Sequence, residues 1–85
     1  MRTTITFEIT QAAERCGLSA NDILEFISFE WVQPLDPENL LLDEADLARI
    51  LLISELKVQL GVNNEGVPII LHLIDQLNHL HRELL

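Results

Sequence analysis

Two prolines three residues apart, Pro34 and Pro37, most constrain what this chain can fold into. Proline lacks a backbone N–H and holds φ near −65°, so neither residue suits a helix interior. The segments on either side, residues 31–33 and 40–42, are mostly apolar. This pattern predicts a small hairpin or wing that separates two helical regions.

The first residues have a different periodicity. Residues 4–9 read Thr-Ile-Thr-Phe-Glu-Ile, in which apolar and polar side chains alternate. A period of two with β-branched residues is typical of a half-buried strand, so we expect one there.

Two short helices are predicted between this strand and the wing. Thr10 is a plausible N-cap for a helix over residues 11–16, which Gly17 ends. Ser19 is placed to cap a second helix over residues 20–29. Its apolar residues share one face, namely Ile23, Phe26 and Ile27, and its polar residues share the other, namely Asn21, Asp22, Glu25 and Ser28. The pair predicts a helix-turn-helix.

Two further helices are predicted after the wing. Asp43 opens the third, with Asp46 at its N3 position, and Gly61 ends it after Leu60. Its apolar residues predict deep burial and are Leu47, Ile50, Leu51, Leu52, Ile53 and Leu56. Pro68 falls in the first turn of a last helix that continues to the chain end. We expect a mainly α winged helix-turn-helix domain over residues 1–62, in the order β-α-α-β-β-α, and a C-terminal helix over residues 63–85.

The last helix carries an apolar seam. Its members are spaced three and four residues apart over two heptads and are Ile70, Leu73, Leu77, Leu80 and Leu84. The seam fits a helix that folds back on its own domain, or one that meets a second chain. Val67, Ile69 and Ile74 widen the stripe, so we favour homodimerisation, which would also supplement the small core of an 85-residue chain.

Charge disfavours nucleic acid as a partner. The net charge is −9, and no Lys or Arg occurs between Cys16 and Ala48. That stretch contains eight acids, Asp22, Glu25, Glu30, Asp36, Glu38, Asp43, Glu44 and Asp46. Proteins that bind nucleic acid need cations to replace phosphate counterions. An acidic tract suits a basic protein partner, or serves only to keep the chain soluble.

No catalytic or cofactor motif is present, so we expect a protein that is not an enzyme and needs no cofactor. His72 and His79, with Asp75 between them, are better explained as a solvated helix face than as a metal site. Cys16 follows Arg15, which could lower its pKa, but a lone cysteine at a helix end is more often a small core residue.

The second helix is the best candidate for a partner surface, because Leu24 lies among acids on its outward side. The candidate residues span this helix and its approach to the wing: Asp22, Leu24, Glu25, Ser28, Glu30 and Trp31. Tryptophan is frequent among interface anchors, which keeps Trp31 in the set, whereas Phe29 is expected to fill the core.

The longest apolar run, from Ile50 to Ile53, is too short to cross a bilayer, and the first residues lack the apolar region of a signal peptide. With a single cysteine, these features predict a cytoplasmic protein with no membrane partner.

Two runs resemble MerR-like domains, Ile9-Thr-Gln-Ala-Ala-Glu-Arg-Cys-Gly-Leu-Ser19 and Leu42-Asp-Glu-Ala-Asp-Leu47. DNA-binding members carry cations on the second helix, which residues 19–28 lack. The chain is more similar to the chaperone-modulator (CbpM-type) family of that group, in its leading segment, its acidic second helix, the Leu42-Asp-Glu step and its aliphatic tail. The resemblance implies a homodimeric adaptor that binds the J-domain of a DnaJ-like co-chaperone and inhibits it.

Two other functions stay open. One is a DNA-binding transcriptional regulator of the MerR or excisionase-like kind, which the missing basic residues disfavour. The other is a structural dimerisation module or an antitoxin-like partner of a different protein.

Overall fold

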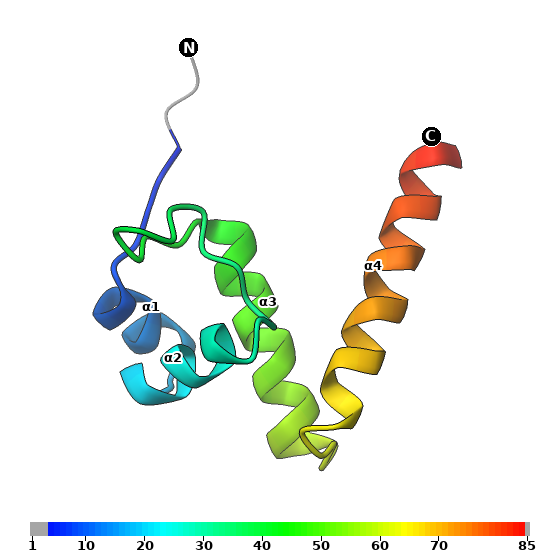
Figure 1. The fold of residues 1–85 in the computed structure, drawn as a ribbon, viewed down its shortest axis with the longest axis horizontal. Coiled ribbons are helices and arrows are strands. Elements are labelled where there is room, and N and C mark those ends of the chain that lie inside the picture. The colour runs from blue at the N-terminus through cyan, green and yellow to red at the C-terminus, as the bar shows by residue number, and fades with distance from the viewer. Residues whose placement is uncertain (1–3, 85) are drawn as a thin grey trace. The chain divides into compact units, whose positions relative to one another are not determined.

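The computed structural model describes residues 4–84, and this part of the chain is mainly helical, as predicted (Figure 1). In chain order the elements are α1 (Ile9–Cys16), α2 (Ala20–Ser28), α3 (Glu44–Ser54), the π-helical segment η1 (Glu55–Gln59) and α4 (Gly66–Leu84). The chain divides into two compact units, Met1–Leu52 and Ile53–Leu85. The domain boundary after residue 62 stays a prediction, because compactness does not show which unit folds alone.

The strand predicted over residues 4–9 is wrong. Helix α1 begins at Ile9, because Glu8 and Gln11 form a capping box in which the Glu8 N–H donates to Gln11 Oε1 over 2.9 Å. The cap predicted at Thr10 is therefore wrong as well. What remains of the strand is one antiparallel bridge, in which Phe7 and Leu42 exchange N–H···O bonds of 2.7 and 2.9 Å.

The helix-turn-helix of α1 and α2 is confirmed, and the two helices pack against each other (Figure 1). Gly17 ends α1 in the left-handed conformation, with φ of 68°. Ser19 caps α2, since its hydroxyl oxygen accepts the Asp22 N–H over 3.1 Å. Ile23 and Phe26 of α2 are buried, on the face that the spacing predicted.

The wing is reduced to a tight loop. A single antiparallel bridge joins Asp36 to Leu41, with N–H···O bonds of 3.1 and 3.0 Å, and the described residues of the loop form no strand. Pro34 and Pro37 cannot donate to a ladder, which limits pairing on this side. Asn39 closes the turn by donating from its backbone and side-chain nitrogens to the Asp36 carboxylate.

The start of α3 is fastened to the loop. Asp43 and Asp46 cap each other: the Asp46 N–H donates to Asp43 Oδ1 over 2.8 Å, and Asp46 Oδ2 accepts the Asp43 N–H over 3.0 Å. The same Oδ2 atom accepts the Leu35 N–H over 3.0 Å. Ile50 of α3 is fully buried, but Leu51 is exposed, so the deep burial predicted for Leu51 is wrong.

The second unit is a helical hairpin. Its buried side chains are Ile53, Leu56, Val67 and Leu71. The first helix of this hairpin consists of the end of α3 and η1, and Gly61 ends it as predicted, with φ of 66°. The Val62 N–H donates to the Leu56 carbonyl oxygen over 2.8 Å. The Asn63 side chain accepts the Gly66 N–H over 2.8 Å and so caps α4.

Helix α2 ends in a Schellman motif that lacks the usual glycine. The Trp31 N–H donates to the Phe26 carbonyl over 3.0 Å and the Glu30 N–H to the Ile27 carbonyl over 2.9 Å. Glu30 occupies the left-handed position, with φ of 63°, where α1 and η1 have glycine. A side chain in this conformation costs about 1–2 kcal/mol.

We therefore expect Glu30→Gly to raise the free energy of unfolding by about 1 kcal/mol, because it removes the steric conflict but adds backbone entropy to the unfolded chain. Urea unfolding measures this change. Glu30→Gln is the matched control, since it removes the charge without relieving the backbone, and it should leave stability almost unchanged. A loss of stability in Glu30→Gly would contradict the strain.

Candidate functional site

The outward face of α2 is acidic and partly apolar. Asp22 and Glu25 are exposed, and Leu24 between them is 40% exposed. Asp22 also has a structural role, because its carboxylate accepts the Ser19 N–H over 3.4 Å. The Ser28 hydroxyl donates to the Glu25 carbonyl over 2.7 Å, so it is already satisfied within the helix. Leu24 and Glu25 are thus the residues of this face that are most available to a partner.

The sequence predicted that Trp31 is available to a partner and that Phe29 fills the core, and the structure shows the reverse. Trp31 is only 6% exposed, whereas Phe29 is 45% exposed. Their ring centroids lie 4.7 Å apart, and Trp31 also contacts Phe26 at 5.9 Å. The tryptophan is buried because it occupies the C″ position of the Schellman motif, where an apolar side chain packs back on the helix. Phe29 is therefore the aromatic side chain that a partner can reach.

A shallow hollow of about 370 Å³ lies where α2 passes into the loop. Its lining combines four apolar residues with two polar ones and consists of Ile27, Glu30, Val32, Gln33, Pro34 and Pro37. Of these, only Glu30 was a predicted site residue. The two prolines were the sequence signal for the loop that lines the hollow, but they did not predict the hollow itself. We call the hollow, together with the exposed residues Leu24, Glu25, Phe29 and Glu38, the α2–loop surface.

The exposed charged side chains that α2 and the loop contribute to the α2–loop surface are all acidic. Glu25, Glu30 and Glu38 are exposed, and hydrogen bonds from the side chain and backbone of Asn39 hold the pKa of Asp36 below its usual value. The nearest cation in the sequence after this segment, Arg49, donates to the Trp31 carbonyl oxygen. Such a surface attracts cations and repels phosphate.

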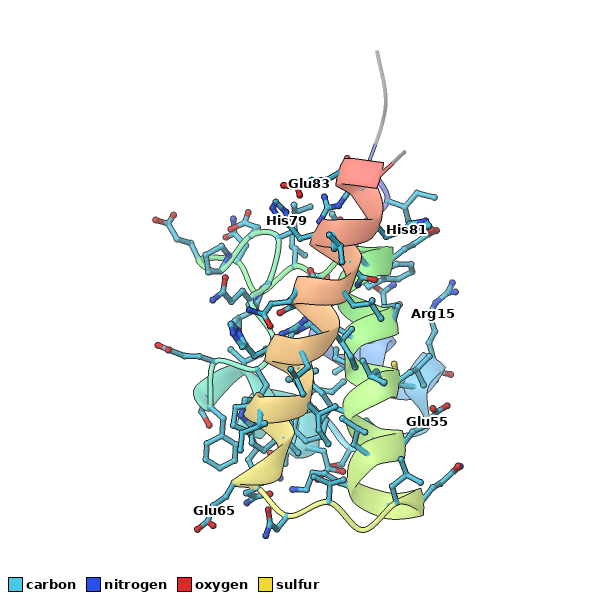
Figure 2. The ribbon with its side chains drawn as sticks, turned by 90° about the vertical axis from the view of Figure 1, so that its right-hand side faces the viewer. Arg15, Glu55, Glu65, His79, His81 and Glu83 are labelled. Carbon is cyan, nitrogen blue, oxygen red and sulfur yellow. The ribbon has the colours of Figure 1, made fainter. Side chains whose placement is uncertain are left out.

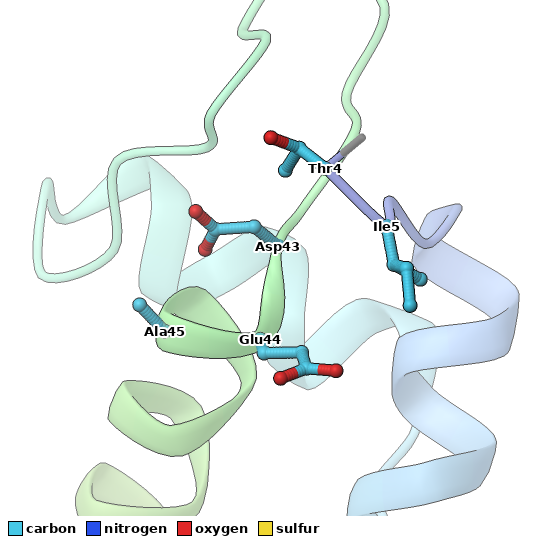
Figure 3. A pocket seen from close by; sticks show the side chains of 5 residues that line it. All are labelled: Thr4, Ile5, Asp43, Glu44 and Ala45. Carbon is cyan, nitrogen blue, oxygen red and sulfur yellow. The ribbon is translucent and has the colours of Figure 1, made fainter. Parts of the chain in front are cut away.

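A second pocket, of about 270 Å³, lies between the leading segment and the start of α3 (Figure 3). Thr4 and Ile5 line it from one side, and Asp43, Glu44 and Ala45 from the other. Asp43 is already used to cap α3. Next to it, partial burial raises the pKa of Asp46. The acidic residues of this pocket therefore belong to the start of α3, where Asp43 has a structural role.

Cys16 and the histidines form no reactive centre. The Cys16 thiol is half-buried, 4.0 Å from the Leu47 carbonyl oxygen, and burial raises its pKa. Arg15 lies instead over the Phe7 ring, 4.7 Å from its centroid. His79 pairs with Glu83 over 3.1 Å on one side of α4 (Figure 2). Among residues 4–84 no group of three or more potential metal ligands converges.

Helix α4 has two apolar sides. Val67 and Leu71 are buried and Ile70 is half-buried, whereas four apolar side chains on another side are each more than half exposed: Ile69, Leu73, Leu77 and Leu80. Ile69 is thus more exposed than Ile70, and the place of Ile70 in the seam stays a prediction. The side chain of Leu84, also predicted in the seam, lies outside the described residues.

The described chain thus consists of a helix-turn-helix, formed by α1 and α2, then α3 with η1, and the long helix α4. The family model described as "MerR HTH family regulatory protein" matches residues 7–85, so the chain belongs to the MerR helix-turn-helix family. No curated protein sequence matches the chain significantly. Within residues 4–84 no helix has the length and apolar character that a membrane span requires.

Proposed function

We propose that this protein is a non-enzymatic cytoplasmic adaptor that binds the J-domain of a DnaJ-like co-chaperone and inhibits it. The partner contacts the α2–loop surface, in the place where DNA-binding helix-turn-helix proteins present their second helix to the duplex. The observation that carries this proposal is the absence of any cation between Cys16 and Ala48, the segment that contains α2 and the loop.

Exposed carboxylates act mainly on the rate of encounter with a basic partner and on the choice of partner. Leu24 and Phe29 add apolar area that a partner can desolvate, and such area supplies most of the affinity at an interface. The combination of the two favours a basic protein surface with some apolar side chains. The resemblance of the chain to chaperone modulators makes a J-domain the leading candidate for that surface.

DNA binding is the second candidate, because the family is described as regulatory and has a helix-turn-helix. Duplex DNA carries about one negative charge per 1.7 Å of its axis, and binding requires Lys or Arg side chains that neutralise phosphates. The α2–loop surface offers Glu25, Glu30 and Glu38 in their place. Charge therefore favours the protein partner over the duplex.

The double variant Asp22→Asn/Glu25→Lys tests the partner surface. The asparagine side chain keeps an oxygen that can accept the Ser19 N–H, so the helix should persist while the surface charge becomes more positive by three units. We expect binding to the J-domain, measured by titration calorimetry, to weaken about five- to tenfold, because each exposed charge pair contributes about 0.2–1 kcal/mol. The loss should shrink as salt is added.

The matched control is Glu14→Gln/Glu55→Lys, which makes the same change in net charge at exposed residues of α1 and η1. This control should bind the J-domain like the wild type. Equal losses of affinity in both double variants would show that binding depends on the net charge of the protein and not on charges of α2. Undiminished binding in Asp22→Asn/Glu25→Lys would remove α2 from the interface.

We further propose that the protein is a homodimer through the exposed apolar side of α4. This helix has 19 residues, and apart from Ile70, Leu71 and Ile74 its apolar side chains from Ile69 to Leu80 are exposed. Contact with a second copy along this stripe would bury leucines that a single chain leaves in water.

Replacing Leu77 and Leu80 by Lys should give a monomer in sedimentation experiments, because the new charges would have to be desolvated in the seam. The control variant, His72→Lys/Asn78→Lys, adds two charges at exposed residues away from the leucine stripe and should remain dimeric. A wild-type protein that sediments as a monomer at tens of micromolar would contradict the dimer.

A further inference from the structure

We propose that the hollow at the end of α2 receives an aliphatic side chain of a basic partner helix, and that the Glu30 carboxylate binds a cation next to that side chain. This inference rests on the proposed function, since it names the feature that the partner presents. It shifts the centre of the interface from Leu24 to the hollow.

The lining of the hollow supports an apolar occupant. Ile27, Pro34 and Pro37 supply its accessible apolar surface, whereas Val32 is almost fully buried, and the two prolines make the wall stiff because their φ angles are fixed. A stiff, preformed hollow loses little conformational entropy when it is filled. A volume of about 370 Å³ accommodates an aliphatic side chain and leaves room for the neighbouring chain. Phe29, which precedes Glu30 in the chain, is exposed but does not line the hollow.

The charge around the hollow selects a cationic neighbour. Glu30 belongs to the lining, and Glu38 adjoins Pro37 and is exposed. A partner helix with Lys or Arg three or four residues from an aliphatic residue would place both groups on one face, and so over the hollow.

Glu30 occupies its position at a conformational cost that the other helix ends avoid. Gly17 and Gly61 have φ of 68° and 66° at the corresponding turns, and Glu30 has 63°. Residues that break a local rule of this kind are concentrated at functional sites. Glycine would stabilise the turn but would leave the rim of the hollow without its carboxylate. Glu30 therefore supplies a carboxylate to the hollow at the expense of a less strained turn.

A synthetic helical peptide that pairs leucines with lysines three and four residues away provides the probe. Trp31 is the only tryptophan of the chain, which contains no tyrosine, and it lies between Glu30 and Val32, which both line the hollow, so its fluorescence reports on events there. We expect the peptide to change this fluorescence at saturation. A peptide with serine in place of leucine should bind at least about tenfold more weakly. A peptide with glutamate in place of lysine should not bind.

Two protein variants complete the test. Glu30→Gln keeps the shape of the side chain and should weaken binding of the lysine–leucine peptide about threefold, whereas Glu14→Gln, on α1, should have no effect. Equal binding of the serine and leucine peptides would overturn the apolar occupant, and full binding to Glu30→Gln would overturn the role of Glu30. The J-domain is titrated in parallel. If it binds wild type and Glu30→Gln equally, the inference fails and the proposed function stands; if only the peptide binds, the proposed function fails.

Discussion

The first unit depends on Trp31, which joins α2, the loop that follows it, and α3. Its N–H closes the end of α2, its indole packs on Phe26, and its carbonyl oxygen accepts a hydrogen bond from Arg49 of α3. The side chain is almost fully buried, so the loop leaves the helix at a fixed point. Because Trp31 turns inward, the preceding aromatic residue, Phe29, is left outside. The core and the candidate surface are therefore set by the same turn.

The second constraint is that the surface around this turn carries one sign of charge. A helix-turn-helix presents its second helix outward regardless of the ligand, and the side chains on that helix decide what can bind. Here the α2–loop surface combines carboxylates with Leu24 and Phe29. The same scaffold that exposes cations to phosphate in a DNA-binding protein exposes acids and apolar groups in this one. Membership of the MerR family thus describes the fold, and the surface chemistry favours a protein ligand.

Local rules predicted much of the fold. Gly17, Ser19, Gly61 and Pro68 are found at the helix ends where the sequence placed them, because each acts through its own backbone or through a residue three positions away. The predicted strand failed because alternation over residues 4–9 cannot reveal the capping box that draws Ile9 into α1. The two strands predicted for the wing are also absent from the described residues. There the prolines limit backbone pairing to one bridge.

The candidate surface was less predictable than the fold. The exposed acids and Leu24 follow from helical spacing, but the exchange between Phe29 and Trp31 depends on a left-handed turn at Glu30, a residue that sequence rules do not expect there. The hollow depends on the same turn, because it joins α2 to a loop whose direction is set by tertiary contacts. Helical spacing thus predicted that Leu24, the centre of the candidate surface, is exposed, but it did not predict that Phe29 is the exposed aromatic residue and Trp31 the buried one.

The central claim is that the α2–loop surface binds a basic protein in place of DNA. It is tested most directly by amide chemical-shift mapping of the ¹⁵N-labelled protein, titrated separately with the J-domain and with duplex DNA in about 150 mM salt. The account predicts that the J-domain perturbs backbone amides within residues 22–38. It also predicts that duplex DNA perturbs no amide at a concentration of about 100 µM, at which non-specific DNA-binding proteins are already bound. DNA shifts concentrated on α2, or J-domain shifts confined to α4, would contradict it.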